Sequence, residues 1–250
     1  MSVKEYLPAC FAGMPIFTYD MVDSTNNAAK RYFLDGGMLP ALFIADGQTA
    51  GRGRNGRSFF SPSGAGLYMS LALPINTSPD KAISFTAIAA VAVCKAIEQL
   101  TDIRPAIKWV NDIYVSERKV CGILVEAMPD KDGNMAAVIG IGINLTDAGF
   151  PDDLRGIACS LNEPELSREE LAGAIISRLA RYLDGEDWLA EYRGYSMIMG
   201  KTVRCIHGNE VFTGKAIAID ERGGLMVEDG KGKIRTLRSG EISLRLAPEE

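Results

Sequence analysis

The sequence predicts an α+β fold, in which a mixed sheet with helices is followed by a small all-β module. β-prone apolar runs alternate with segments of helical periodicity over most of the chain. The texture changes near Gly200, after which short β-type segments are separated by glycine turns at a spacing of roughly 8–12 residues. We therefore expect two domains, 1–198 and 199–250, in this chain of 250 residues.

The N-terminal part begins with a short β-prone run at 16–19, which is followed by a helix over 24–34. Ser24 is the expected N-cap of this helix, and the two glycines at 36–37 end it. Residues 41–45 form a continuous apolar run, which is typical of a buried strand.

A further strand is expected at 67–73, and the clearest helix of the chain follows at 81–100. Its apolar side chains lie on most faces, so we expect it to be buried. Two strands at 107–115 and 120–127 are joined by a polar turn, and a glycine-punctuated strand follows at 135–143.

A loop-like stretch at 149–164 leads into two helices. The helix over 167–183 is amphipathic, with Ser167 as N-cap and Glu170 completing a capping box. A shorter helix is expected at 187–195, and the β-type segments of the second domain extend from there to about residue 246.

Composition excludes several kinds of chemistry. The chain carries 32 acidic and 27 basic residues, so its net charge of -5 weakens any bulk attraction to nucleic acid or anionic membranes. A single histidine, His207, lies in a polar segment typical of a turn, and one imidazole cannot build a multi-histidine zinc site, so we expect no metal site of the protein's own. The five cysteines are widely spaced, which favours reduced thiols in a cytoplasmic protein.

The segment 47–66 is the most unusual part of the chain, because it is rich in glycine and arginine while no acidic residue occurs from 47 to 79. Glycine lets backbone N–H groups approach an anion closely, and arginine adds a planar fork for carboxylate or phosphate. The run Gly51-Arg52-Gly53-Arg54-Asn55-Gly56-Arg57 therefore indicates an anion-binding loop. A flexible solvated loop and an RNA-binding Arg-Gly segment are the alternatives.

The same run has the glycine spacing of a P-loop, with Arg57 in place of lysine. A P-loop must continue directly into a helix whose N-terminus faces the phosphates. Pro62 and Gly64 follow too closely for such a helix, so this interpretation is rejected.

Polar residues interrupt the apolar strand predicted at 107–115. Lys108, Asn111 and Asp112 would be costly to bury unless they face a cleft or form pairs. They are therefore candidates for a site, and an ordinary paired charge is the alternative.

Two later segments carry weaker signals. In the segment 119–126, Lys119 opens a strand and Gly122 allows close packing on the backbone, although an ordinary strand explains it as well. Gly140 and Gly142 clear one face of the next strand, and Asn144 stands at its end. Since no helix follows, this is not a dinucleotide-binding fingerprint.

Together these segments resemble the biotin protein ligases, in the monofunctional form without an N-terminal DNA-binding domain. The resemblance extends over the whole chain, and the G-R-G-R-x-G-R loop combined with K-W-x-N-D is its most specific part. The matching segments are 23–26, 48–57, 108–112, 119–126, 140–145 and 240–245. Val110 stands where the family usually has proline, and Asn55 where arginine is common. The resemblance implies a class II synthetase-like catalytic domain with a mixed β-sheet, and a small C-terminal SH3-like β-barrel.

The resemblance also implies residue roles. Biotin would be bound by Ser24, Thr25, Asn26, Gln48, Arg52, Gly53, Arg54 and Lys108. ATP would be bound by Arg52, Arg54, Arg57, Phe60, Lys108, Asn111 and Asn144. Phe60 and Trp109 would wall the site. The catalytic residues would be Lys108, Arg54 and Asp112. Asp112 is a candidate to orient the lysine amine that accepts biotin.

The implied activity uses ATP with Mg²⁺ to convert biotin to biotinyl-5′-AMP, and then transfers biotin to a lysine of a biotin carboxyl carrier protein of a biotin-dependent carboxylase. The short stretch before residue 16 leads us to expect no DNA partner. The longest apolar stretch, 82–93, is too short to span a bilayer, so we expect no membrane partner. The family includes monomers and side-by-side dimers, so a homodimer stays open. A lipoate–protein ligase-like enzyme is the nearest alternative, and a nucleic-acid-binding module or an inactive scaffold are the others.

Overall fold

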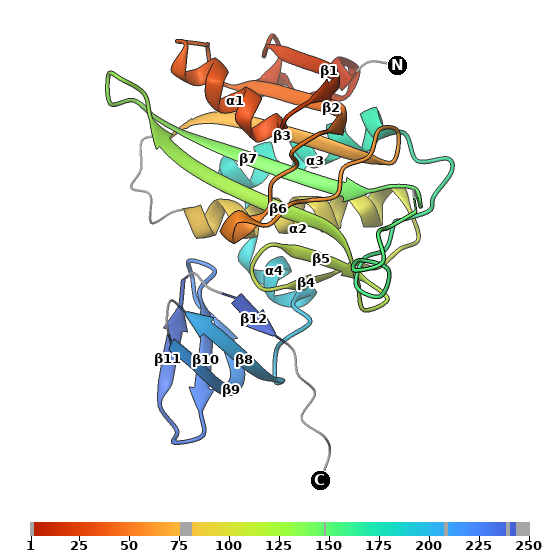
Figure 1. Cartoon of the computed structure of the whole chain (residues 1–250). Coiled ribbons are helices and arrows are strands. Elements are labelled where there is room, and N and C mark those ends of the chain that lie inside the picture. The colour runs from red at the N-terminus through yellow and green to blue at the C-terminus, as the bar shows by residue number, and fades with distance from the viewer. Residues whose placement is uncertain (1–2, 76–81, 148, 208–209, 239–240, 244–250) are drawn as a thin grey trace.

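The computed structural model describes residues 3–75, 82–147, 149–207, 210–238 and 241–243 (Figure 1). These residues form two sheets, one of seven strands and one of five. Every helix that the described residues form precedes the second sheet in sequence. The predicted α+β fold with a C-terminal β module is therefore confirmed.

The larger sheet has the strand order β1-β2-β3-β7-β6-β5-β4. Its strands are β1 (Ile16–Val22), β2 (Ala41–Gln48), β3 (Gly66–Ile75), β4 (Ala106–Lys108), β5 (Asp112–Val115), β6 (Arg118–Pro129) and β7 (Met135–Asn144). β1 and β2 are parallel and all other neighbours are antiparallel, so the sheet is mixed. The long central pair β6 and β7 presents alternate side chains to opposite faces.

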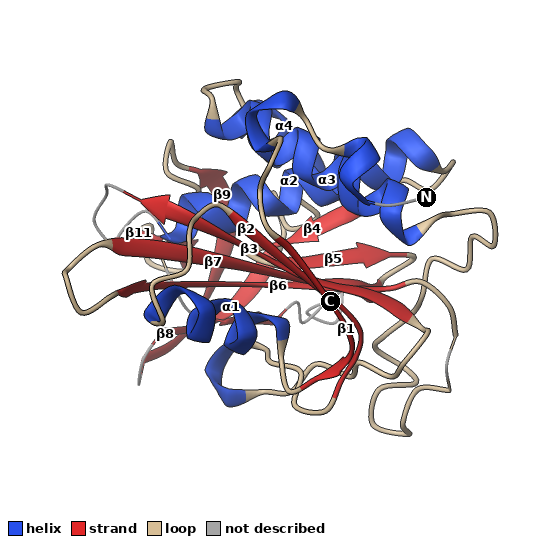
Figure 2. Ribbon diagram, turned by 90° about the horizontal axis from the view of Figure 1, so that it is seen from above, coloured by secondary structure: helices blue, strands red, loops and turns tan. Residues whose placement is uncertain are grey.

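Helices cover both faces of this sheet (Figure 2). α1 (Thr25–Leu34) lies alone on one face, and α2 (Ala82–Leu100), α3 (Arg168–Leu183) and α4 (Leu189–Tyr195) lie on the other. Three short 3-10 helices, η1 (Val3–Tyr6), η2 (Ala9–Phe11) and η3 (Arg54–Gly56), complete the set. Among the described helices, α2 is long and apolar enough to cross a membrane, but 67% of that stretch is buried in the fold, so it serves as the core helix.

The predicted caps are confirmed in position and differ in chemistry. Ser167 is the N-cap of α3, and its hydroxyl accepts a hydrogen bond from the Glu170 N–H. Ser24 is the N-cap of α1, but its side chain makes no capping hydrogen bond. The Ser24 hydroxyl is therefore not used for capping, and Ser24 lines the polar cleft described below.

The single strand predicted over 107–115 is wrong. The chain turns back at 109–111, and β4 and β5 form a tight antiparallel hairpin in which Lys108 pairs with Asp112. The turn is held from outside the hairpin: the Tyr192 hydroxyl donates to the Val110 carbonyl at 3.2 Å, and Asn111 Nδ2 donates to the Ile123 carbonyl at 2.9 Å. These contacts are with residues far along the chain, so the local apolar pattern could not reveal the turn.

The smaller sheet has the order β11-β10-β9-β8-β12. Its strands are β8 (Thr202–His207), β9 (Glu210–Ile219), β10 (Leu225–Asp229), β11 (Ile234–Leu237) and β12 (Glu241–Ser243). The glycine turn expected at 208–209, and the tail beyond 243, lie outside the described residues. The chain passes between the domains at 196–201, and the boundary at 198 stays a prediction.

The smaller sheet docks onto the turn that follows Lys108 (Figure 1). The Trp109 indole donates to the Gly223 carbonyl at 2.9 Å, and the Arg193 guanidinium donates to the Ile219 carbonyl at 2.6 Å. Trp109 is 3% exposed, so its hydrogen bond forms away from water. The C-terminal module therefore fixes the strand end that carries Lys108.

We expect Trp109→Phe to lower the free energy of unfolding by about 1–3 kcal/mol, because the buried Gly223 carbonyl loses its donor. Urea unfolding measures this loss, and limited proteolysis should show earlier cleavage between the domains. The control is Trp188→Phe, which makes the same change of side chain next to Gly223. Equal losses in the two variants would show that ring packing, rather than the hydrogen bond, holds the module.

Candidate active site

The glycine-arginine loop forms a short hairpin across one face of the larger sheet. The Gly53 N–H donates to the Arg57 carbonyl at 2.7 Å, and the Phe59 N–H donates to the Gly51 carbonyl at 2.9 Å. Asn55 at its tip has a positive φ of 54°, a conformation that asparagine tolerates better than most residues. The loop thus holds its arginines on a defined turn.

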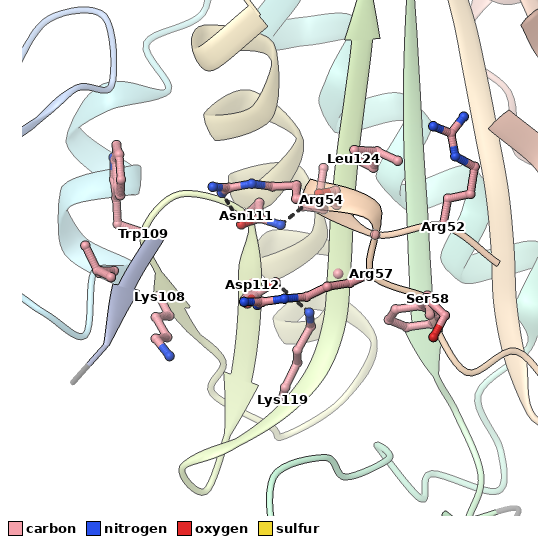
Figure 3. Close-up of a pocket in the computed structure, with 15 residues that line it drawn as sticks. Arg52, Arg54, Arg57, Ser58, Lys108, Trp109, Asn111, Asp112, Lys119 and Leu124 are labelled. Carbon is pink, nitrogen blue, oxygen red and sulfur yellow. Dashed lines mark hydrogen bonds and ion pairs between the residues drawn. The ribbon is translucent and has the colours of Figure 1, made fainter. Parts of the chain in front are cut away.

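A cationic cavity of about 140 Å³ lies between this loop and strands β4, β5 and β6 (Figure 3). Its lining residues are Arg52, Gly53, Arg54, Arg57, Ser58, Phe59, Lys108, Trp109, Asn111, Asp112, Lys119, Gly122, Ile123, Leu124 and Ile242. Five of these side chains are cations and one is a carboxylate, so the cavity favours an anion. Ile242 belongs to β12, so the C-terminal module contributes part of the wall.

The cavity is held together by polar contacts between the loop and the sheet. Arg54 Nη1 donates to Asn111 Oδ1 at 2.7 Å, which ties the loop to the β4–β5 turn. Asp112 Oδ1 lies 2.7 Å from Lys119 Nζ, so the carboxylate is paired with a cation of the neighbouring strand. Asp112, predicted as an orienting group, is therefore present in the cavity as an ion pair.

The two lysines of the cavity differ in their surroundings. Lys108 Nζ lies 3.4 Å from the Tyr114 hydroxyl and 5.4 Å from the centre of its ring. Lys119 Nζ lies 3.2 Å from the position that a Cβ would take on Gly122, beside the Phe59 ring. Sequence reasoning noted Lys119 as the start of a strand and gave it no role, since only the pairing of β5 with β6 brings it to Asp112.

A second, polar cleft adjoins the cavity at the N-terminus of α1. Its lining residues are Ser24, Thr25, Asn26, Gln48, Arg52, Phe59, Gly122, Leu124, Gly140, Ile141 and Gly142. The structure thus brings together Ser24, Thr25, Asn26 and Gln48, four of the residues that the resemblance implies for biotin binding. The two cavities share Arg52, Phe59, Gly122 and Leu124.

Hydrogen bonds fix the side chains of this cleft. Gln48 Oε1 accepts from the Thr25 N–H at 2.9 Å, and Gln48 Nε2 donates to Ser61 Oγ at 2.9 Å. Ser70 Oγ lies 2.6 Å from Asn26 Oδ1, and since an amide oxygen can only accept, the hydroxyl is the donor. Ser61 and Ser70 escaped the sequence analysis because each is a lone hydroxyl among apolar or loop residues.

Glycines on β6 and β7 make room for these side chains. A Cβ on Gly140 would lie 1.9 Å from Asn26 Oδ1, and one on Gly142 would lie 2.7 Å from the Phe59 ring. Gly122 and Gly142 are paired across the two strands, and the Phe59 ring covers both. The cleft has a volume of only about 20 Å³, roughly that of one water molecule, because Phe59 fills the glycine-lined groove.

We expect Gly140→Ala to destabilise the fold by about 1–3 kcal/mol and to displace Asn26, because overpacking in a tight core forces side chains from their positions. Asn26 cannot yield freely, since its amide is bound by Ser70, Leu124 and Glu126. Thermal unfolding measures the loss. Gly194→Ala in α4, where a Cβ meets no atom within 4 Å, is the control and is expected to leave stability unchanged or raised.

A carboxylate that the sequence analysis assigned no role, Glu126, stands at the far end of the cleft. Its oxygens lie 3.0 Å from Asn26 Nδ2, 3.0 Å from Lys30 Nζ and 3.2 Å from Arg52 Nη2. Burial alone would raise the pKa of Glu126, but the hydrogen bonds from Asn26 and Lys30 and the charges of Lys30 and Arg52 lower it. The group is therefore a carboxylate at neutral pH.

Two predicted ATP-binding residues do not line either cavity. The Phe60 ring packs against the Phe150 ring, with centroids 6.1 Å apart. Asn144 is buried at the end of β7, and its Nδ2 donates to the Cys159 carbonyl at 3.0 Å. Their roles stay predictions.

Other chemistries find little support among the residues that the structure describes. No group of three or more histidine, cysteine or carboxylate side chains is placed to hold a metal ion within the described ranges. Burial raises the pKa of the Cys94 and Cys121 thiols, which makes them poor nucleophiles. The charge of the site is therefore carried by arginine and lysine.

The larger sheet is mixed, and it carries a cationic cavity beside a polar cleft whose side chains are fixed by hydrogen bonds. Comparison with known proteins identifies the class. Residues 19–144 match the model of the biotin/lipoate A/B protein ligase family, and residues 198–245 match the biotin protein ligase C terminal domain. The chain belongs to the biotin/lipoate A/B protein ligase family.

Individual relatives agree with this assignment. The bifunctional ligase/repressor BirA of Bacillus subtilis is 34% identical over 93% of this chain and 74% of its own length. The biotin–[acetyl-CoA-carboxylase] ligase of Mycobacterium tuberculosis is 31% identical over 88% of this chain and 83% of its own. The biotin protein ligase from Aquifex aeolicus in complex with biotin and ATP superimposes with a TM-score of 0.78 at 29% identity, covering 92% of this chain and 98% of that one.

Proposed function

We propose that this protein is an ATP-dependent biotin–protein ligase that forms biotinyl-5′-AMP and transfers biotin to a lysine of a carrier protein. The observation that carries the proposal is the pair of joined cavities, one polar and one cationic, with Arg52 and Phe59 at their junction. The Mycobacterium tuberculosis relative is named a biotin–[acetyl-CoA-carboxylase] ligase and the Aquifex aeolicus structure a biotin protein ligase, so the lipoate alternative is not favoured.

The polar cleft is the proposed site of the ureido head of biotin. Ser24, Thr25, Asn26 and Gln48 offer hydroxyl and amide groups whose orientations are already fixed by neighbours. A ureido group carries one acceptor and two donors, which such a set can match. The valeryl tail would then follow the groove over Gly122 and Gly142 toward the cationic cavity.

The cationic cavity is the proposed site of the carboxylate and the ATP phosphates. In the first step a carboxylate oxygen attacks the α-phosphorus, the new P–O bond forms, and the bond to pyrophosphate breaks. The nucleophile is already an anion, so no general base is needed. The site must supply close placement, and positive charge as charge moves onto pyrophosphate. The cations that can supply it are Arg52, Arg54, Arg57, Lys108 and Lys119.

Lys119 is proposed to share the role assigned to Lys108. The Lys119 ammonium lies beside Gly122, a residue that lines both cavities. The Lys108 ammonium instead lies over the Tyr114 ring. We place the mixed anhydride beside Gly122, where Lys119 is the nearer of the two lysines. Asn111 holds Arg54 over the same place.

In the second step the neutral ε-amine of the carrier lysine attacks the acyl carbon, the C–N bond forms and the acyl C–O bond to AMP breaks. The proton lost by the amine passes to solvent water. Asp112 is the carboxylate in the cavity and is proposed to orient this amine after separating from Lys119. Mg²⁺ would arrive with the nucleotide phosphates. One carboxylate with phosphate oxygens and water suits that ion, which rarely uses an all-protein cage.

The Phe59 ring must leave the glycine-lined groove before the tail of biotin can enter it. We infer that ligand binding moves the loop 47–66 and that the loop then covers the intermediate. A covered site keeps water from the reactive anhydride. The carrier domain, a homodimer and a cytoplasmic location stay predictions.

The test is incubation of the protein with ATP, Mg²⁺, biotin and a biotin carboxyl carrier domain, followed by mass measurement of the carrier. We expect one biotinyl group on one lysine. Pyrophosphate exchange with biotin and with lipoate separates the two ligase activities. Folded protein that exchanges with lipoate alone, or that transfers nothing, would overturn the proposal.

A further inference from the structure

The Glu126 side chain lies on the face of the larger sheet that carries α1 and the polar cleft, opposite the face covered by α2, α3 and α4. Gly122, Leu124 and Glu126 are alternate residues of β6, so their side-chain positions share one face of the sheet. Across the strands they pair with Gly142, Gly140 and Val138. The row therefore extends from the cationic cavity, through the polar cleft, to the carboxylate of Glu126.

This carboxylate joins three separate segments. Asn26 and Lys30 come from α1, and Arg52 comes from the loop. Two cations surround one carboxylate, and the exposed fractions of Lys30 and Glu126 are 21% and 22%. Lys30 alone is enough to neutralise Glu126, so the guanidinium of Arg52 is an additional positive charge that an anionic ligand can use.

The geometry leaves one edge of Arg52 available. Its Nη1 donates to Asn27 Oδ1 at 2.9 Å and to Glu126 Oε2 at 3.4 Å, while its Nη2 lies 3.2 Å from Glu126 Oε1. A guanidinium has five N–H donors, and the edge formed by Nε and Nη2 suits a carboxylate or phosphate. Among the described residues, none accepts a hydrogen bond from the Nε–H.

We propose that Glu126 is a positioning residue that holds Arg52 at the junction of the two cavities with its free edge turned to the carboxylate of biotin, an inference that rests on the proposed function. Arginine loses considerable rotamer freedom when it is fixed, and here much of that loss precedes binding. Figure 3 shows Arg52 directed away from Arg54 and Arg57, as this separate anchor requires.

The test is the biotin KM in ATP–pyrophosphate exchange. Glu126→Gln keeps an oxygen that can accept from Asn26 and removes the charge that holds Arg52. We expect the biotin KM to rise about tenfold, as for the loss of a charged hydrogen bond in a partly exposed setting. We expect kcat to stay nearly unchanged, because Arg52 contacts biotin equally in the ground state and in the transition state. In an Arg52→Met background, the same change should alter KM less than about twofold.

Two further variants separate positioning from structural support. Lys30→Met breaks the link from α1 to β6 but keeps the contact of Arg52 with Glu126, so its KM should stay near that of the unaltered protein. Glu186→Gln removes a remote ion pair and is the matched control. Should Glu126→Gln fail to fold, the double variant with Lys30→Met leaves no lysine without its carboxylate and should show the same rise.

An equal KM increase with and without Arg52, or an equal increase from Lys30→Met, would overturn the inference. Absence of biotin-dependent exchange in the unaltered, folded protein would instead overturn the proposed function. The two failures are therefore distinguishable.

Discussion

Lys119→Met is expected to slow biotin-dependent ATP–pyrophosphate exchange by about 100-fold or more, as happens when one preorganised donor is removed from a developing anion. Methionine keeps the length of the side chain and most of its packing. Lys119 lies beside Gly122, which lines both cavities, so we expect its charge to be nearer than that of Lys108 to the bond that forms. Lys108→Met is expected to have a smaller effect, about tenfold, because that ammonium rests against Tyr114.

The control for charge loss alone is Lys95→Met, which removes a similarly buried lysine ion pair with Glu191 far from the loop. Lys119→Met also leaves Asp112 without its partner, so the double variant with Asp112→Asn separates the loss of the cation from the presence of an unpaired carboxylate. A larger loss from Lys108→Met than from Lys119→Met would reverse the assignment of the two residues.

Arg54→Gly is expected to change where biotin goes more than how fast it is activated. The side chain ties the loop to the β4–β5 turn through Asn111, and that tie would be lost while the four other cations of the cavity remain. The intermediate would then escape and acylate lysines of bystander proteins. Mass measurement of added albumin, beside the carrier domain, detects this labelling.

Asn55→Gly is the matched control, because it removes a side chain from the same turn without changing its charge, at a position whose φ glycine accepts. We expect labelling of the carrier alone in that variant. Labelling confined to the carrier with Arg54→Gly would show that Arg54 does not retain the intermediate.

The sequence predicted the elements whose pattern is local. The helix over 24–34 appears as α1, and the alternate glycines at 140 and 142 do clear one face of β7. The cluster of Ser24, Thr25, Asn26 and Gln48 was predicted through family resemblance, and the structure gathers it in one cleft. The helix and the alternating glycines are patterns visible within one segment, and the cluster follows from motifs shared with the family.

What escaped prediction depends on contacts between distant segments. The β4–β5 hairpin is held by Tyr192 and Ile123, and an apolar run gives no sign of either. Lys119 and Glu126 look like ordinary charges at the ends of a strand. Their importance depends on which neighbours the register of β6 gives them, and register is set by the whole sheet.

The docking of the small sheet also bears on how the protein is made. The Trp109 indole binds the Gly223 carbonyl, which a ribosome adds 114 residues later, and Ile242 of β12 closes part of the cavity wall. A nascent chain that already holds every cation of the loop thus still lacks the support of the turn after Lys108. Competence to activate biotin should therefore appear late in synthesis, after the last strand has emerged, rather than in proportion to the length of chain completed.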